Sequence, residues 1–425
     1  MIRMVLEPLA QLSKEGMRLT CPDGKIRWGH PILAGWIGDY PEYIKLFSAQ
    51  FMSCPICVAP KDKMDAHPSL PYTYRSIDTH RMSHYVSVYA ENHKLKKPSA
   101  VEKKKADYVP PTVQEKAEAT AKMTLVEEWF TSQRLKVIDN FLWSIPYVTP
   151  RFLWKPDILH TLDLGMVKHS LEWMFNMLDE HDKALGDLFD ITWMSISPHQ
   201  SVTIPNKKYR AVKQWSGKEY RNAAHLMIPV LEATLLAYPS SEEQRQIFEK
   251  SLDCLSALVD FFLMANYNSF TFPDGRELDD EYRAELDRRT PPDDRDSVAW
   301  LSHNLAVFHN TKDAFLKYRA TKTVKKDARI YSNGMAPNPD SDDEDVRKMT
   351  KAERTGLKKE AIEARKVFYE DYLIENASYN MPKVHLMGHF PPVIVQFGVL
   401  KYLSTSIVEL NHTTLNDAYD RTNKV

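Results

Sequence analysis

The stretch His385-Leu386-Met387-Gly388-His389, followed by Phe390-Pro391-Pro392, sets two histidines four residues apart. On a helix, residues at this spacing lie on one face, so both imidazoles point the same way. Far upstream, Cys54-Pro55-Ile56-Cys57 supplies two thiols at the spacing of a zinc knuckle. Two thiolates and two imidazoles complete a tetrahedral shell, so the sequence predicts a structural zinc site. Taken separately, the cysteines could be a buried pair in a turn, and the histidines ordinary core or surface residues.

Two acids flank this predicted zinc site. Asp39 precedes the cysteines by about one helix length, and Glu409 follows the histidines at a similar distance. Nucleases and transposases with an RNase H-like core bind two divalent ions through such carboxylates, which fits Asp39 and Glu409 as ligands of catalytic Mg²⁺ or Mn²⁺. Each acid also has a purely structural explanation. Asp39 would cap a helix that begins near Pro41, and Ser406-Ile407-Val408-Glu409 has the pattern of a capping box.

Composition points to an ordinary intracellular globular protein. The chain has 425 residues, of which 43% are hydrophobic and 27% charged, and its formal net charge is −1. This balance gives no sign of nucleic-acid binding by the whole molecule, so a DNA-binding face must come from local patches. No apolar run reaches the roughly 18 residues of a membrane span. Four cysteines are too few for a disulfide framework in a chain of this length.

The local patterns predict a mostly helical α+β protein. Apolar residues recur at helical spacing over 2–12, which predicts a helix that Gly16 would terminate. Asp23-Gly24 marks a hairpin turn. The apolar run 32–37 predicts a buried strand that delivers Asp39 at its end. From Thr112 to about Ala320 the pattern is helical, including 157–178 and 244–264, with Ser216 as a further helix cap. A polar helix is predicted over about 347–376.

Six blocks spread along the chain resemble, in the same order, those of Plavaka-type transposases, which belong to the Kyakuja–Dileera–Zisupton group. Any one block is moderately specific, whereas six in order are strong. The blocks are ILAGWIGDYPE (32–42), CPIC (54–57), KPDILHTLDLG (155–165), VKQWSGKEY (212–220), HLMGHFPPVIVQFG (385–398) and TSIVELNHTTLNDAYDRTNKV (405–425).

The resemblance implies a DDE transposase whose RNase H-like core is interrupted by a long helical insertion. Residues 1–60 would form a partial core with the hairpin, the strand and the cysteine pair. Residues 61–376 would be the insertion, with charged loops near 94–114 and 320–347, and residues 377–425 would return to the core with the histidine pair and a helix bearing Glu409. Matched by position, Asp39 becomes the second catalytic Asp and Glu409 the catalytic Glu. DNA would be the partner and the nucleus the location; the oligomeric state stays open.

Asp157 and His160 lie in one of the matching blocks and are candidate accessory residues. Either His160 points toward the active site or the zinc, or Asp157 caps a helix behind Pro156 while His160 packs. The capping and packing interpretation is favoured.

Compared with complete members of the family, the chain is expected to lack the first three strands, the first catalytic Asp and any N-terminal DNA-binding module. Two-metal chemistry depends on all its bridging carboxylates, so the chain alone is expected not to cleave or join DNA. The alternative function is a non-catalytic DNA-binding or protein-interaction remnant with a structural zinc site. In that case the basic stretches Lys94–Lys105 and Arg319–Arg329 would contact phosphates, although each could be a solvated linker.

Overall fold

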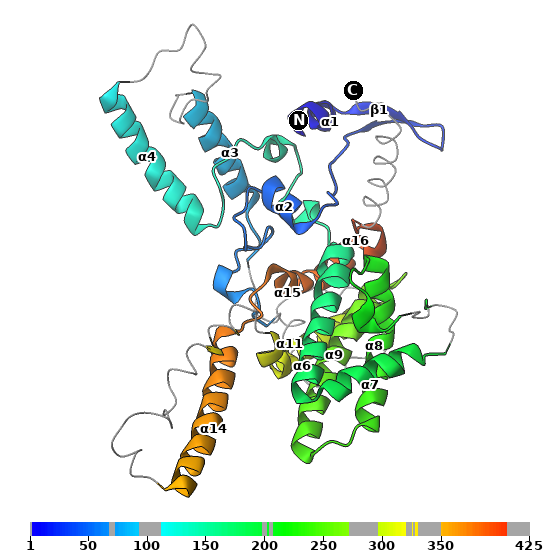
Figure 1. Ribbon diagram of the computed structural model, residues 1–425. Helices are drawn as coiled ribbons and strands as arrows, with labels where there is room; N and C mark the ends of the chain where they lie inside the picture. The colour runs from blue at the N-terminus through cyan, green and yellow to red at the C-terminus, as the bar shows by residue number, and fades with distance from the viewer. Residues whose placement is uncertain are drawn as a thin grey trace, which may run out of the picture.

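The computed structural model describes residues 2–67, 73–92, 112–197, 202–203, 207–271, 296–319, 325, 328–329 and 350–405. Helices dominate this part of the chain and accompany one small sheet, which confirms the mostly helical α+β class (Figure 1). The longer helices are α1 (Ile2–Glu15), α3 (Ile77–Asn92), α4 (Val113–Ser132), α6 (Lys168–His181), α7 (Lys183–Met194), α8 (Gly217–Ala237), α9 (Glu242–Ala265), α11 (Ser297–Thr311) and α14 (Lys351–Asn376). The shorter ones are α2 (Tyr40–Leu46), α5 (Pro150–Leu153), α15 (Pro382–Met387) and α16 (Phe390–Phe397).

The predicted hairpin forms. Strand β1 (Met17–Thr20) pairs antiparallel with β2 (Ile26–Gly29), with Met17 opposite Gly29. Gly24 takes a φ of 76° in the turn, and Gly16 takes the same φ where α1 ends, a conformation that glycine adopts without strain. The hairpin is the only sheet among the described residues, so the larger sheet of an RNase H-like core is not seen there.

The predicted buried strand over 32–37 was wrong. Only Trp36 makes a β-bridge, with Trp154, and Ile32 is exposed. Side chains satisfy the backbone carbonyls instead: the Lys155 ammonium donates to Ala34 O at 3.0 Å, and the Tyr43 hydroxyl donates to Trp36 O. With these two carbonyls taken by side chains and Trp36 N bonded to Leu153 O, the segment offers no continuous row of acceptors to a neighbouring strand.

The predicted helix over 157–178 forms in two parts. Residues Leu159–Val167 adopt a π-helix, labelled η4, which continues into α6. At Gly165, an added Cβ would lie 2.6 Å from the carbonyl oxygen of His160, so the glycine permits the wide turn. π-Helical segments recur at functional sites, and this one carries the candidate residue His160.

Helices α6, α7, α8, α9 and α11 pack into a bundle, with α8 between α7 and α9 and with α11 along α9 (Figure 1). The bundle does not have a core of its own. One continuous apolar cluster runs from Leu6 of α1 through the Cys54–Met64 segment and the bundle to Leu400. The first and last parts of the described chain therefore pack into the same apolar core as the bundle.

The charged stretches predicted near 94–114 and 320–347 lie mostly outside the described residues, as does the whole of 406–425. A search of the described helices found none with the length and apolar character needed to cross a bilayer.

Candidate metal centre

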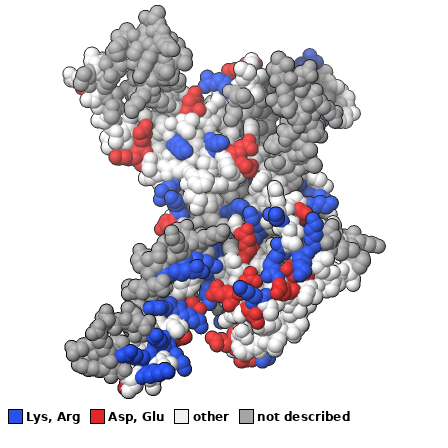
Figure 2. Space-filling view, viewed as in Figure 1, with Lys and Arg blue, Asp and Glu red and all other residues white. Residues whose placement is uncertain are grey.

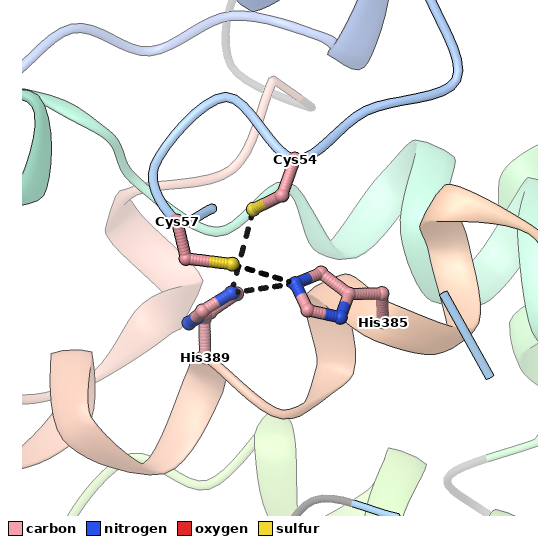
Figure 3. Close-up of side chains that lie close together, drawn as sticks. All are labelled: Cys54, Cys57, His385 and His389. Carbon is pink, nitrogen blue, oxygen red and sulfur yellow. Dashed lines mark hydrogen bonds between the residues drawn. The ribbon is translucent and has the colours of Figure 1, made fainter. Parts of the chain in front are cut away.

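Cys54, Cys57, His385 and His389 meet in the interior of the protein (Figure 3). The Nε2 atom of His385 lies 3.1 Å from the Cys57 sulfur, and the Nε2 atom of His389 lies 3.5 Å from the Cys54 sulfur. The two Nε2 atoms are 3.0 Å apart, and all four residues are buried. The predicted convergence of the two pairs is confirmed.

The four ligand atoms are close enough together that small side-chain shifts would give the shell of a tetrahedral zinc ion. With Zn–S bonds of about 2.3 Å and Zn–N bonds of about 2.0 Å, neighbouring ligand atoms lie about 3.3–3.8 Å apart. All four atoms in this cluster lie within 4.8 Å of one another. Both imidazoles turn Nε2 to the centre, so their lone pairs can reach the same ion as the two sulfurs. The cluster can bind a metal such as zinc.

The cysteine loop is held from its outer side by a short extended segment. Thr73 O accepts a hydrogen bond from Val58 N at 3.0 Å, and Cys57 forms a β-bridge with Tyr74. The buried guanidinium of Arg75 donates from Nε to Cys54 O at 3.0 Å and from Nη1 to Gln133 O at 2.6 Å. Arg75 therefore places a fixed positive charge beside the two sulfurs and ties their loop to the end of α4.

The histidines come from two consecutive helices rather than from one. His385 lies in α15, which begins at Pro382, whereas His389 is the N-cap of α16. The backbone stays close to helical through Gly388, so the predicted four-residue spacing still brings the rings together. The Asn380 side chain ties this region to the segment after the cysteines, since its Oδ1 accepts from Met64 N at 2.8 Å.

The environment favours a thiolate at Cys54. Burial raises the pKa of this thiol, but the hydrogen bond from Cys57 and the electrostatic effect of His385 and His389 outweigh burial and lower the pKa well below its ordinary value. Burial and then the neighbouring Cys54 raise the pKa of Cys57. A divalent cation would stabilise the second thiolate, because metal binding competes with the proton for the sulfur.

Asp39 serves as the N-cap of α2, and its Oδ1 accepts a hydrogen bond from Glu42 N at 2.8 Å. The next residue links this helix start to the cysteine loop, because the Tyr40 hydroxyl donates to Ser53 O at 3.0 Å. The other predicted catalytic acid, Glu409, lies outside the described residues.

Asp157 and His160 form a separate polar cluster. The buried Asp157 carboxylate accepts from Thr405 Oγ1 at 2.6 Å, and its other oxygen lies 2.7 Å from His160 Nδ1. His160 Nδ1 also lies 3.1 Å from Thr405 Oγ1, and Leu159 N donates to Ser404 Oγ at 3.3 Å. These contacts tie the start of the π-helix to the segment that precedes Glu409, and the structure places His160 against Asp157 and Thr405 rather than among the zinc ligands.

Sequence analysis missed Arg75, Ser404 and Thr405. None of them belongs to a spaced pair, and each acts through contacts with residues distant in sequence. A positively charged side chain 18 residues after Cys57 is too common a pattern to single out.

The comparisons agree with the resemblance seen in the sequence. A family model described as Plavaka transposase matches residues 1–174. The match includes Asp39, the cysteine pair, Asp157 and His160, and the histidine pair lies beyond it. Neither the curated proteins nor the solved structures contain a match to the chain.

Proposed function

We propose that this chain, whose residues 1–174 match the Plavaka transposase model, is a transposase-derived protein that acts on DNA and contains a structural zinc site. The observation that carries this proposal is the meeting of Cys54 and Cys57 with His385 and His389 across most of the chain. In a DDE core with an insertion, this cluster would join the place where the chain leaves the core to the place where it returns. Residues 1–60 and 377–425 would be the two parts of an RNase H-like core, and 61–376 the insertion.

The role of the zinc would be structural. Four protein ligands fill a tetrahedral shell and leave no open position for water or substrate. All four residues are buried, which also separates the ion from a DNA strand in solution. Binding the metal would therefore contribute to folding rather than to strand cleavage.

Asp39 and Glu409 are our candidates for the ligands of catalytic Mg²⁺ or Mn²⁺. In two-metal phosphoryl chemistry, carboxylates hold the ions that activate the attacking water and stabilise the leaving oxygen. Support for Asp39 comes from its place at the start of α2, one residue before Tyr40, whose hydroxyl reaches the cysteine loop. Glu409 follows the second histidine ligand by 20 positions in the sequence. Strand cleavage and transfer in the nucleus would be the activity of a complete core of this family, in which a further carboxylate joins these two; with Asp39 and Glu409 alone we expect no cleavage.

A second candidate function is non-catalytic DNA binding or protein interaction. The observation in its favour is the hydrogen bond from Glu42 N to Asp39 Oδ1, which gives this carboxylate a sufficient structural role as a helix cap. The Asp157 carboxylate is likewise engaged with His160 and Thr405.

One set of measurements tests both candidates. Zinc is quantified in the purified full chain by mass spectrometry, and nicking of supercoiled plasmid is followed with Mg²⁺ or Mn²⁺. The key variant is Asp39→Asn, because asparagine caps a helix as well as aspartate does but is a much weaker ligand for Mg²⁺. Glu42→Gln serves as a matched control at the same helix start.

Metal-dependent nicking that disappears in Asp39→Asn and persists in Glu42→Gln supports the catalytic candidate. Zinc-loaded protein that binds DNA and leaves the plasmid intact supports the non-catalytic one. Protein that folds without zinc and does not bind DNA overturns both.

A further inference from the structure

We infer that the turn formed by residues 47–53, beside Asp39, binds an unpaired strand of DNA. The ring of Phe51 stacks on a base, and the ammonium groups of Lys45 and Lys136 contact phosphates. The inference rests on the proposed action on DNA and specifies where a strand is held. The turn directly follows α2 (Figure 1). Figure 2 shows lysine and arginine side chains over the part of the molecule that carries α2, within a mostly uncharged surface.

Hydrogen bonds fix this turn at both ends. Where it begins, Asn140 Nδ2 donates to Leu46 O at 2.6 Å. Where it ends, the Tyr40 hydroxyl donates to Ser53 O at 3.0 Å. In the middle, Ala49 is fully buried. The outer side chains of the turn are therefore held in place before any ligand arrives, which lowers the entropy cost of binding.

Phe51 exposes an aromatic ring on this fixed turn. The residue is 66% exposed, and its neighbouring ring among the described residues is that of Tyr40, with the two centroids 6.2 Å apart. The next residue, Met52, has a φ of 60°, a conformation that residues other than glycine rarely adopt. A strained turn thus carries an apolar ring into water, an arrangement that is costly for folding and that recurs in loops that bind ligands.

This ring lies close to the candidate catalytic acid. Tyr40, which contacts Phe51, directly follows Asp39 in the chain. Asp39 and Lys45 lie at opposite ends of α2, about 9 Å apart along the helix axis at roughly 1.5 Å per residue. Phosphates of a stacked strand follow about every 3.4 Å, so roughly three of them span this distance. A base stacked on Phe51 would bring its neighbouring nucleotides toward the metal that Asp39 is proposed to hold.

Two cations flank the turn. Lys45 lies in the last turn of α2, and the backbone N of Lys136 donates to Ser48 O at 2.7 Å. Both lysines are exposed, and neither ammonium has an ion pair or hydrogen bond in the described part of the chain, whereas the nearby Arg134 is half-buried. The helix dipole accounts for Lys45, because a cation stabilises the C-terminal end of a helix. Lys136 lies outside any helix, so the dipole does not account for it.

The chemistry of this surface favours an unpaired nucleic acid strand over a protein partner. Cations beside an exposed ring suit a ligand that combines negative charge with flat apolar surface, as nucleotides do. In a duplex each base is stacked between its neighbours, so a side chain reaches a base face only by separating a base step. An unpaired strand offers its base faces directly to Phe51.

The basic run 319–329, which the sequence suggested for phosphate contact, is less suitable. The guanidinium of Arg319 lies over the rings of Tyr379 at 5.0 Å and Trp173 at 5.9 Å. Arg319 thus stabilises the junction of η7 (Lys317–Arg319) with α6 instead of facing a ligand.

The test uses the full zinc-loaded chain and a fluorescent single strand of about 15 nucleotides and mixed sequence, with the matching duplex as a second probe. Anisotropy is recorded from about 50 to 300 mM KCl without divalent ions, so that the salt dependence of binding is obtained. Phe51→Ala removes the ring, and Phe51→Tyr keeps one. Lys45→Gln/Lys136→Gln removes the two charges.

Each change has a matched control elsewhere on the surface. Tyr85→Ala removes a ring from α3 at a residue that is 65% exposed, close to the exposure of Phe51. Lys183→Gln/Lys250→Gln removes two exposed charges from the bundle. Circular dichroism and zinc content verify that each protein is folded.

We expect Phe51→Ala to bind the single strand about tenfold more weakly with an unchanged salt dependence, because stacking releases no counterions. Phe51→Tyr should bind as the wild type does. The lysine variant Lys45→Gln/Lys136→Gln should reduce the slope of log Kd against log salt by about 1.4, at roughly 0.7 for each phosphate contact. Both controls should retain the wild-type affinity and slope.

Wild-type affinity in Phe51→Ala, or an equal loss in Tyr85→Ala, would refute the inference and leave the proposed function intact. The same holds if the slope of the lysine variant does not change, or if Phe51→Ala weakens duplex binding as much as single-strand binding. Wild-type protein that binds neither the strand nor the duplex would overturn both the inference and the proposed action on DNA.

Discussion

The sulfur of Cys57 lies 3.1 Å from Nε2 of His385, although 328 positions separate the two residues in the chain. The apolar core that runs from α1 to Leu400 already brings these two parts of the described chain together. A shared metal ion would add to that packing, since apparent binding energies of structural zinc are roughly 10 kcal/mol or more.

Zinc removal should destabilise the whole protein. Incubation with a strong chelator is expected to lower the melting temperature by more than about 5 °C, because metal that binds only the folded state adds its binding energy to folding. Differential scanning fluorimetry would record the change. Cys57→Ser should lack zinc and show no response to the chelator. Cys254→Ser, which alters a buried cysteine outside the cluster, should behave as the wild type does.

Arg75→Met should weaken zinc binding by about 10-fold to 100-fold, the usual effect of losing a residue that orients metal ligands. The variant keeps an unbranched apolar stem but loses the donors to Cys54 O and Gln133 O and the charge beside the sulfurs. Competition with a chromophoric chelator measures the affinity. Arg151→Met is the control, because Arg151 stacks on the neighbouring Tyr74 at 4.5 Å. An equal loss in both variants would point to general loosening.

Asp157→Ala should lower the free energy of unfolding by about 3 kcal/mol, because it leaves several buried donors without their acceptor. Thr405→Val removes only one of these donors and should cost about 1 kcal/mol. Urea denaturation measures both values. Zinc content should stay at one ion per chain in each variant, since Asp157 belongs to a separate cluster. A loss of zinc in Asp157→Ala would contradict that separation.

The free energy of unfolding should fall in mild acid because His80 is held neutral in the folded state. Burial, and then the charge of Arg75, lowers its pKa to about 3, and its ring stacks on Trp143 at 4.4 Å. Neither ring nitrogen has a hydrogen-bond partner among the described residues. Since the unfolded pKa is about 6.5, the unfolded state takes up the proton first, and the contribution of this group is lost as the pH falls from about 6.5 toward 3.

His80→Phe should reduce the difference in the free energy of unfolding between pH 7 and pH 5 by about 2 kcal/mol. The reason is that pH 5 lies about 1.5 units below the unfolded pKa of histidine, and each unit corresponds to about 1.4 kcal/mol. Urea denaturation at the two pH values measures the difference. Equal acid sensitivity in the variant and the wild type would show that the ring is not held neutral in the folded state.

Short-range patterns predicted much of the fold. The hairpin at Gly24, the end of α1 at Gly16 and the helix cap at Ser216 all formed where the sequence places them, because each depends on residues within a few positions. The metal cluster was also predictable, since two ligand pairs with restrictive spacing leave few other arrangements.

The segment 32–37 was not predictable in this way. Its apolar pattern is that of a strand, yet the Lys155 ammonium and the Tyr43 hydroxyl take the carbonyls that a ladder would need. Lys155 lies more than 100 residues away, so a local window contains only one of the two competing donors. The contacts of Arg75, and the contact of Thr405 with Asp157, were missed for the same reason.

The cysteine–histidine cluster also has a mechanical consequence. With an ion bound, the 327 residues between Cys57 and His385 form a loop whose ends are fastened together. Tension applied to the two chain ends would then pass through four coordination bonds and bypass the helical bundle. Once those bonds broke and the bundle unfolded, the chain would lengthen by about 1,100 Å at roughly 3.4 Å per residue, so a bound metal would shield the bundle from stretching.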